Sequence, residues 1–317
     1  MQLPFVHLGR NQGQGIPWVN TAHPLAVGLS AAYAPGWFPS GVISNLVSPT
    51  IGDIVTRVGF GSANGQAPGV TPEGPGLAYL ATLGGAITVS SQGVCPASWK
   101  VASGSSLFVR GQQLVGSATT KASTIFGLTS STGPFSIYAL GKGAAGVPTQ
   151  AFSLQYSNTT AFNSAPGAIT VANGLMYSLA GTFGAGAPGI MYVNGLADVL
   201  GSSNPTITSL NYGTGTVSIS LGNGNATEQV GSDTTVAYLW PQRVLTPNEI
   251  SYLDQNPYSL LLWPSDLIMA ELVGTSSVVP PATSVFKPML LSPLMVAGGA
   301  MEWLGRRKMT MRRLRGE

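Results

Sequence analysis

Charged residues are scarce in this chain of 317 residues, of which they make up 8%, whereas an ordinary soluble domain has about 25%. The few charges are unevenly placed. Six of the 14 bases lie within the last thirteen residues, and these are Arg306, Arg307, Lys308, Arg312, Arg313 and Arg315. Residues 1–304 keep 8 bases and 10 acids. A nucleic-acid-binding domain carries its bases across a folded face, so we do not expect the body to bind nucleic acid.

Cysteine, histidine and long apolar runs are equally rare. Cys95 is the only cysteine, and His7 and His23 are the only histidines. An internal disulfide and a cysteine-based zinc site are therefore excluded, and we expect no cofactor. The longest apolar candidate, residues 289–304, is interrupted by a proline and a glutamate and falls short of the roughly 20 apolar residues that span a bilayer. The first residues lack the pattern of a signal peptide, so neither secretion nor a membrane span is expected.

Glycine, proline and apolar residues are abundant instead. The chain has 42 glycines, 23 prolines and 44% hydrophobic residues. Short apolar runs between turn residues are typical of an all-β sandwich or barrel. We expect strands at 77–83, 86–90, 106–110, 123–128, 135–140, 151–156, 175–183, 190–193, 216–221 and 234–240. A turn is expected at 71–76, and Asn194-Gly195 is the strongest hairpin signal.

One helix is expected near the end of the body. Thr246 is a suitable N-cap, Pro247 suits the first helical position, and Glu249 completes a capping box. The helix should end near Gln255, because Asn256 precedes a proline. Residues 274–288 are rich in serine, threonine, valine and proline, which indicates a linker or an extended arm.

The order of these features resembles the laminin G-like, concanavalin A-type domains of bacteriophage virion proteins. The resemblance covers about residues 20–264. Four stretches carry it: 23–29; 71–79 with 86–89; 179–183 with 190–195; and 236–240 with 243–253 and 256–258. It implies an antiparallel jelly-roll sandwich with one short helix near its C-terminal end and extended arms. The domains expected are an arm at 1–20, the jelly roll at 21–264, and a linker, apolar segment and basic tail at 265–317.

The same resemblance implies a structural component of a bacteriophage particle, with a head decoration (cement) protein as the first interpretation. A tail-associated or fibre adhesin that binds a host-surface glycan is the alternative, and a glycoside hydrolase is third. The expected localisation is the virion, assembled in the host cytoplasm. The expected partners are shell or tail subunits and a glycan. Because charge keeps subunits apart, a surface so poor in charge also favours a homo-oligomer.

The acids are the candidates for catalysis, and the aromatic residues are the candidates for sugar binding. Glycoside hydrolysis needs two acids that flank the scissile bond. Glu228 and Asp233 flank a turn and could approach each other, but solvated turn acids are the simpler explanation, so we expect no enzymatic activity. Trp240 is expected in the core, whereas Trp18 and Trp37 lie in loop-like sequence and could be exposed to a sugar.

The basic tail is the remaining candidate for partner docking. Six cations within ten residues could bind phosphate or acidic lipid, or an acidic surface of a neighbouring protein. A solvated terminus is the third interpretation, and the sequence leaves all three open.

Overall fold

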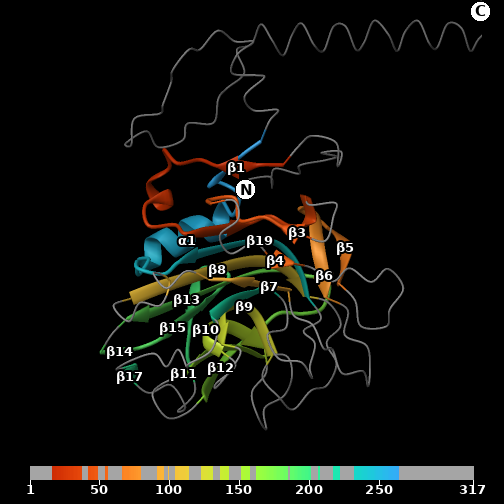
Figure 1. The fold of residues 1–317 in the computed structure, drawn as a ribbon. Coiled ribbons are helices and arrows are strands. Elements are labelled where there is room, and N and C mark those ends of the chain that lie inside the picture. Colours follow the sequence, from red (N-terminus) through yellow and green to blue (C-terminus); the bar gives the residue numbers. More distant parts are fainter. Residues whose placement is uncertain are drawn as a thin grey trace, which may run out of the picture. The chain divides into compact units, whose positions relative to one another are not determined.

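Two antiparallel eight-stranded sheets make up most of the body in the computed structural model (Figure 1). The structure describes residues 16–37, 42–48, 54–55, 66–79, 91–95, 99, 104–113, 123–130, 136–142, 151–157, 162–184, 186–200, 206–207, 217–221 and 232–263. The all-β prediction is confirmed. Among these residues no helix has the length and apolar character needed to cross a membrane.

The first sheet has the order β16-β15-β13-β8-β19-β6-β5. The edge of β19 that faces away from β8 pairs with two strands. Ser232–Thr234 pair with β6, and Ala237–Leu239 pair with β2. The strands of this sheet are β2 (Ala31–Tyr33), β5 (Gln66–Thr71), β6 (Gly74–Tyr79), β8 (Gly104–Gln113), β13 (Met176–Gly184), β15 (Ile190–Val193), β16 (Leu196–Asp198) and β19 (Ser232–Trp240).

The second sheet has the order β12-β11-β10-β9-β18-β7-β4-β3. Its strands are β3 (Val42–Ile43), β4 (Ile54–Val55), β7 (Ser91–Val94), β9 (Ser123–Ser130), β10 (Ser136–Lys142), β11 (Ala151–Ser157), β12 (Phe162–Thr170) and β18 (Val217–Leu221). Two short ladders complete the described strands: β1 (Trp18–Val19) with β20 (Leu261–Leu262), and β14 (Ala187–Pro188) with β17 (Thr206–Ile207).

The main core lies between the two sheets, because strand residues alternate between opposite faces. Along β8, Leu107 and Val109 belong to the same buried cluster as Phe126 and Leu140 of the second sheet. Each of these side chains is fully buried, and burial of one such side chain contributes about 1.5–3 kcal/mol.

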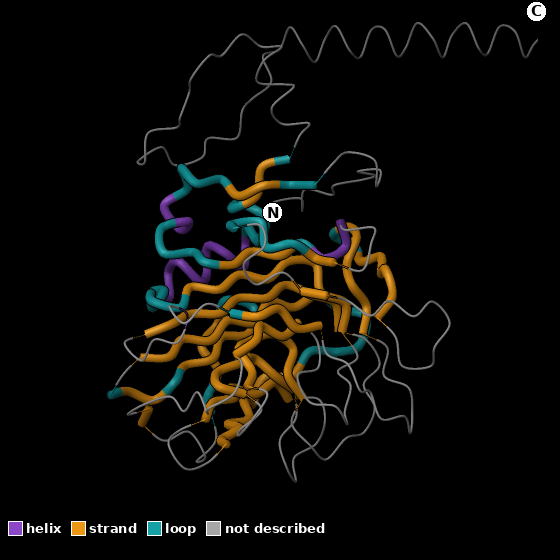
Figure 2. The backbone as a smooth tube through the Cα atoms, in the orientation of Figure 1, coloured by secondary structure: helices purple, strands orange, loops and turns teal. Residues whose placement is uncertain are grey.

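The opposite face of the first sheet is covered by the two ends of the described chain. We call residues 16–30, 34–37 and 241–263 the covering layer. It holds the helical turns η1 (Pro24–Ala26) and η2 (Pro35–Trp37) and the helix α1 (Pro247–Gln255), which lie on one side of the first sheet in Figure 2. A second apolar cluster joins this layer to Phe108 and Trp240, and Trp240 Nε1 donates to the carbonyl of Leu25 at 2.8 Å.

Several local predictions are confirmed residue by residue. Helix α1 begins after Thr246 and ends at Gln255, and both hydrogen bonds of the capping box are present. Asn194 and Gly195 form the predicted turn between β15 and β16, with positive φ angles of 50° and 75°. Such angles match the tight turn that an Asn-Gly pair favours.

Several strands and one turn differ from the predictions: β7 lies at Ser91–Val94, after the strand expected at 86–90, and the short strands β1, β14, β16, β17 and β20 were not predicted. The turn expected at 71–76 is shorter, because Thr71 already pairs with Gly74 across two turn residues. Strands β5 and β12, which contain Pro68 and Pro166, were also not predicted. Both are edge strands, where a proline whose nitrogen faces outward removes no ladder hydrogen bond. The strand expected at 86–90 lies outside the described residues.

Candidate functional site

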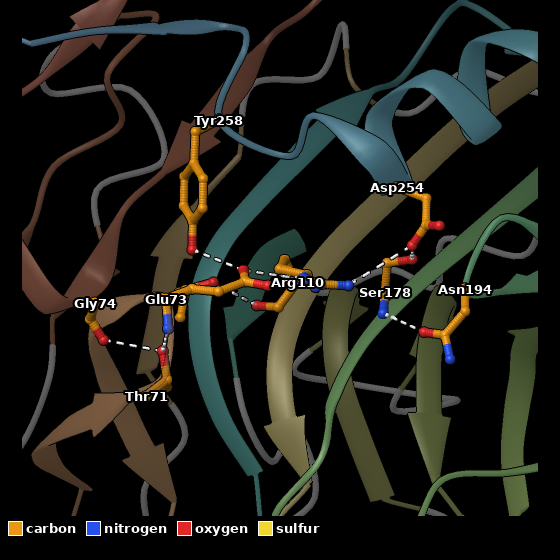
Figure 3. A network of polar contacts seen from close by, with 9 residues as sticks. Thr71, Glu73, Gly74, Arg110, Ser178, Asn194, Asp254 and Tyr258 are labelled. Carbon is orange, nitrogen blue, oxygen red and sulfur yellow. Dashed lines mark hydrogen bonds and ion pairs between the residues drawn. The ribbon is translucent and has the colours of Figure 1, made fainter. Parts of the chain in front are cut away.

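The densest polar cluster of the described chain is centred on Arg110, on the covered face of the first sheet (Figure 3). Arg110 is on β8, directly after Val109 of the core. The alternation that turns Val109 toward the second sheet turns Arg110 toward the covering layer. A guanidinium in this position loses water and needs acidic partners nearby.

Glu73 is the principal partner of Arg110. It lies in the two-residue turn between β5 and β6, and Arg110 Nε donates to its two carboxylate oxygens at 3.0 and 3.2 Å. Nη2 contacts the same carboxylate, which makes the pair bidentate. Burial alone would lower the pKa of Arg110, but the hydrogen bonds and charge of Glu73, with a further contribution from Asp254, raise it.

Asp254 connects the same guanidinium to α1. Its Oδ1 lies 3.6 Å from Arg110 Nη1 and accepts a hydrogen bond from the hydroxyl of Ser178. Ser178 is opposite Arg110 in the β13–β8 register. The β15–β16 turn closes this side, because the Ser178 N–H donates to Asn194 Oδ1 at 2.9 Å. A Cβ atom at Gly195 would lie 3.2 Å from Asp254 Oδ2, so Asp254 would have to shift by a few tenths of an ångström to admit a side chain there.

Tyr258 closes the other side of the cluster. Its hydroxyl donates to Glu73 Oε2 at 3.3 Å, and burial raises the pKa of this phenol far above its ordinary value. Glu73, Arg110, Ser178, Asp254 and Tyr258 therefore join β5–β6, β8, β13, α1 and the segment after α1. We call these five residues the outer-face network.

The outer-face network holds the covering layer to the first sheet through ion pairs and hydrogen bonds. Glu73 and Asp254 share one guanidinium, so each carboxylate already has a cationic partner. In the part of the chain that the structure describes, no group of three or more histidine, cysteine or acidic side chains could hold a metal ion. The arrangement is suited to fastening the covering layer to the sheet.

Asp233, one of the two acids considered for hydrolysis, lies elsewhere on the same face. It is on β19 opposite Gln112, and only 2% of it is exposed. It is not the solvated turn acid that the sequence suggested. Burial raises its pKa to about 7. Glu228, the other acid, lies outside the described residues.

The other predicted site residues divide into three groups. Arg306, Arg307, Lys308, Arg312, Arg313 and Arg315 lie outside the described residues. Trp18 is exposed, whereas Trp37 packs against Trp263 with ring centroids 4.5 Å apart. Trp240 is fully buried in the core, as predicted.

The outer-face network was missed at the sequence level, although one signal was available. Arg110 follows Leu107-Phe-Val109 in a strand whose other residues are uncharged, in a body with only 8 bases. A lone arginine in such a strand indicates that acids must meet it after folding. The identity of those acids is not readable from spacing, since Glu73 and Asp254 lie 37 and 144 residues away along the chain.

The comparisons with known proteins give a distant structural likeness only. No family model and no curated protein matches the chain. A sialidase from Trypanosoma rangeli is 16% identical, with a TM-score of 0.49. The alignment covers 74% of this chain and 33% of the sialidase. The binding domain of botulinum neurotoxin DC is 8% identical, with a TM-score of 0.47 over 73% of this chain and 52% of that domain. The binding domain of Paraclostridial mosquitocidal protein 1 is 12% identical, with a TM-score of 0.46.

These comparisons correct the interpretation of the chain as a bacteriophage decoration protein. The similar solved structures named above are sialidases and toxin binding domains. They give no support to a virion component. The physical reason for the error is that strand order and turn motifs determine a sandwich, whereas the particle that would carry it is determined by surfaces that those motifs do not describe.

Proposed function

We propose that this chain is a non-catalytic β-sandwich module that assembles with copies of itself through the β16 edge of its first sheet. The single observation that carries the proposal is an apolar sheet edge that no charged side chain of the described residues protects. We further infer that the sandwich has the concanavalin A-type, laminin G-like arrangement. Two facing sheets and a closing strand, β19, that leads into a capping helix support that inference.

Strand β16 is the last strand of the first sheet in the described part of the chain. A free edge presents unpaired backbone N–H and C=O groups, and proteins usually protect it with charged side chains or proline. Residues 189–200 contain one charged residue, Asp198, and no proline. Asp198 is only 7% exposed and accepts hydrogen bonds from the N–H groups of Ala168 and Ile169 on β12. Its charge therefore points inward, and no other charged side chain lies within the described residues 189–200.

The side chains around this edge are aliphatic and exposed. Leu196 is 67% exposed and Val199 is 78% exposed, and Ile190 on β15 is 44% exposed. Ile190 and Val199 flank the registered pair of Met191 and Asp198 at the open end of the hairpin. We call Ile190, Leu196 and Val199 the apolar edge.

Val244 extends the apolar edge across the sheet. It is 46% exposed, and its neighbours Arg243 and Leu245 are hydrogen-bonded to Ser106. Ser106 is opposite Thr182, which is opposite Ile190. Two strand spacings separate Ser106 from Ile190, which is about 10 Å. One partner on this face could therefore cover Ile190 and Val244 together.

A second copy of this chain is the partner that fits this surface best. The apolar edge lacks charge, so it offers nothing to a charged ligand, and aliphatic side chains lack the flat rings on which sugars stack. Two copies related by a two-fold axis could pair β16 with β16 and bury both apolar edges at once. The small share of charged residues in the whole chain is consistent with such packing.

The proposal is tested by the molar mass of the full chain in solution over a range of concentrations, measured by light scattering after size exclusion. We expect a dimer or larger species that dissociates on dilution. A lysine at the edge, V199K or L196K, should give monomers, because a charge on an edge strand opposes edge-to-edge pairing. Leu175→Lys is the matched control, since Leu175 is 57% exposed but directly precedes β13, at the end away from the Thr182–Ile190 pair. A wild-type monomer at all concentrations would refute the proposal, as would dissociation by L175K to the same extent.

A further inference from the structure

In the described part of the chain, Asp233 is a buried carboxyl group with an unsatisfied oxygen, which a purely structural aspartate would not be expected to have. Only 2% of the residue is exposed, and among the described residues no donor reaches its buried Oδ1. A buried charge without a partner is costly, and such a group usually becomes neutral instead. Asp198 shows the contrast within the same chain, because its buried carboxylate accepts hydrogen bonds from two backbone N–H groups.

The carboxyl group of Asp233 lies against the backbone of β6. A Cβ atom at Gly76 would lie 2.0 Å from Asp233 Oδ1 and would overlap it. The absence of a side chain at Gly76 therefore makes room for the carboxyl group. The helical turn η2 closes on the same place, since a Cβ atom at Gly36 would lie 2.5 Å from the Gly76 nitrogen. β6 is thus enclosed between β19 and η2 where it meets Asp233.

The elements around Asp233 provide little charge to offset its own. The described part of β6 facing it and the η2 residues, Pro35, Gly36 and Trp37, carry no charged group. β8 contributes the neutral Gln112 opposite Asp233, and further along the same face Arg110, whose guanidinium is bound to Glu73. Burial is the cause of the raised pKa of Asp233, about 7.

We propose that Asp233 is a proton-dependent latch for the β5–β6 hairpin. When Asp233 is protonated, β6 packs against β19 without a buried charge. When it is ionised, the contact is weakened, and water can enter between the two strands. The hairpin turn carries Glu73, so its displacement also weakens the Glu73–Arg110 pair and the attachment of the covering layer. The latch is independent of the self-association proposed above, which uses the opposite edge of the sheet.

The direction of the pH effect follows from proton linkage. The folded chain holds the Asp233 proton up to a pKa of about 7, whereas water-exposed aspartate releases it near its model value of 3.8. The closed hairpin therefore binds more protons between these two values, and its stability falls as pH rises through that window and levels off above it. Between pH 5 and pH 8 the opening equilibrium should rise on the order of a hundredfold.

Hydrogen exchange of the full chain at pH 5 and pH 8, corrected for the intrinsic pH dependence of exchange, measures this change directly. We expect the protection factors of residues 66–79 to fall on the order of a hundredfold in the wild type, and those of β13 to change much less. D233N should abolish the difference, because the amide has the same shape and no charge. D233S provides a second neutral variant in case D233N does not fold. D198N is the control and should leave the pH dependence of the hairpin unchanged.

Two results would overturn the latch. One is equal protection of residues 66–79 in the wild type at the two pH values. The other is a folded D233N or D233S variant that retains the wild-type difference, which would assign the pH dependence to another group.

Discussion

The two faces of strand β8 are held to their neighbours in different ways. The inner face presents Leu107 and Val109 to an apolar core shared with the second sheet. The outer face begins with Phe108 in a smaller apolar cluster and changes at Arg110 to ion pairs and hydrogen bonds. Burial of apolar side chains contributes most of the stabilising free energy and does not depend on their orientation. The ion pairs and hydrogen bonds of the outer-face network contribute less and require a specific geometry. The inner face therefore provides stability, and the outer face determines how the two ends of the described chain are attached.

Truncation on the inner face should have the largest effect and tests the first half of this comparison. Leu107→Ala should lower the free energy of unfolding by about 2–5 kcal/mol, because it removes transfer free energy and leaves a cavity. Denaturant unfolding of the full chain measures the change. Leu107→Met is the control and should cost less than about 1.5 kcal/mol, since it conserves volume. A loss under about 1 kcal/mol for Leu107→Ala would show that the inner face is not the main source of stability.

Removal of the arginine on the outer face should have an intermediate effect. Arg110→Met keeps the aliphatic stem but leaves Glu73 and Asp254 without their cation. Because these groups are partly exposed, we expect a loss of about 1–3 kcal/mol. The double mutant with Glu73→Gln should lose less than the sum of the single changes, since both remove the same interaction. Additive single effects would indicate that Glu73 and Arg110 are not coupled in solution.

The smallest effect is expected at the start of α1, within the covering layer itself. Thr246 accepts a hydrogen bond from the Glu249 N–H at 3.3 Å, and its own N–H donates to Glu249 at 2.8 Å. Thr246→Ala should cost about 1 kcal/mol by removing the cap, and Thr246→Ser should cost little. Thermal unfolding monitored by circular dichroism distinguishes the two. Equal melting temperatures for both variants would mean that α1 is held by packing alone.

Local signals in the sequence predicted the elements whose structure is decided by neighbours along the chain. The capping box of α1 and the Asn194-Gly195 turn need only a few consecutive residues, and both were predicted correctly. Strands β5 and β12 were missed because their prolines are compatible with a strand only at a sheet edge, and edge position is a property of the whole sheet. The burial of Asp233 was missed for the same reason, since β6, β8 and η2 enclose it together.

The candidate site was the least predictable feature. Arg110 could be singled out as a lone base in an otherwise uncharged strand, but Glu73, Asp254 and Tyr258 come from a turn, a helix and a loop that meet only in the folded sheet. In the sequence, Asp233 stands out only as half of a possible acid pair with Glu228 for hydrolysis. The structure gives it a buried position against the backbone of β6.

The pairing of β1 with β20 has a mechanical consequence. Trp18 is opposite Leu262 and Val19 is opposite Leu261 in an antiparallel ladder of two residues, continued by a hydrogen bond from the Asn20 N–H to the Leu260 carbonyl. A tension applied through the two ends of the described chain would load these bonds one after another, as a zipper is opened, rather than all together in shear. The ladder should therefore yield at low force, before tension reaches the two large sheets.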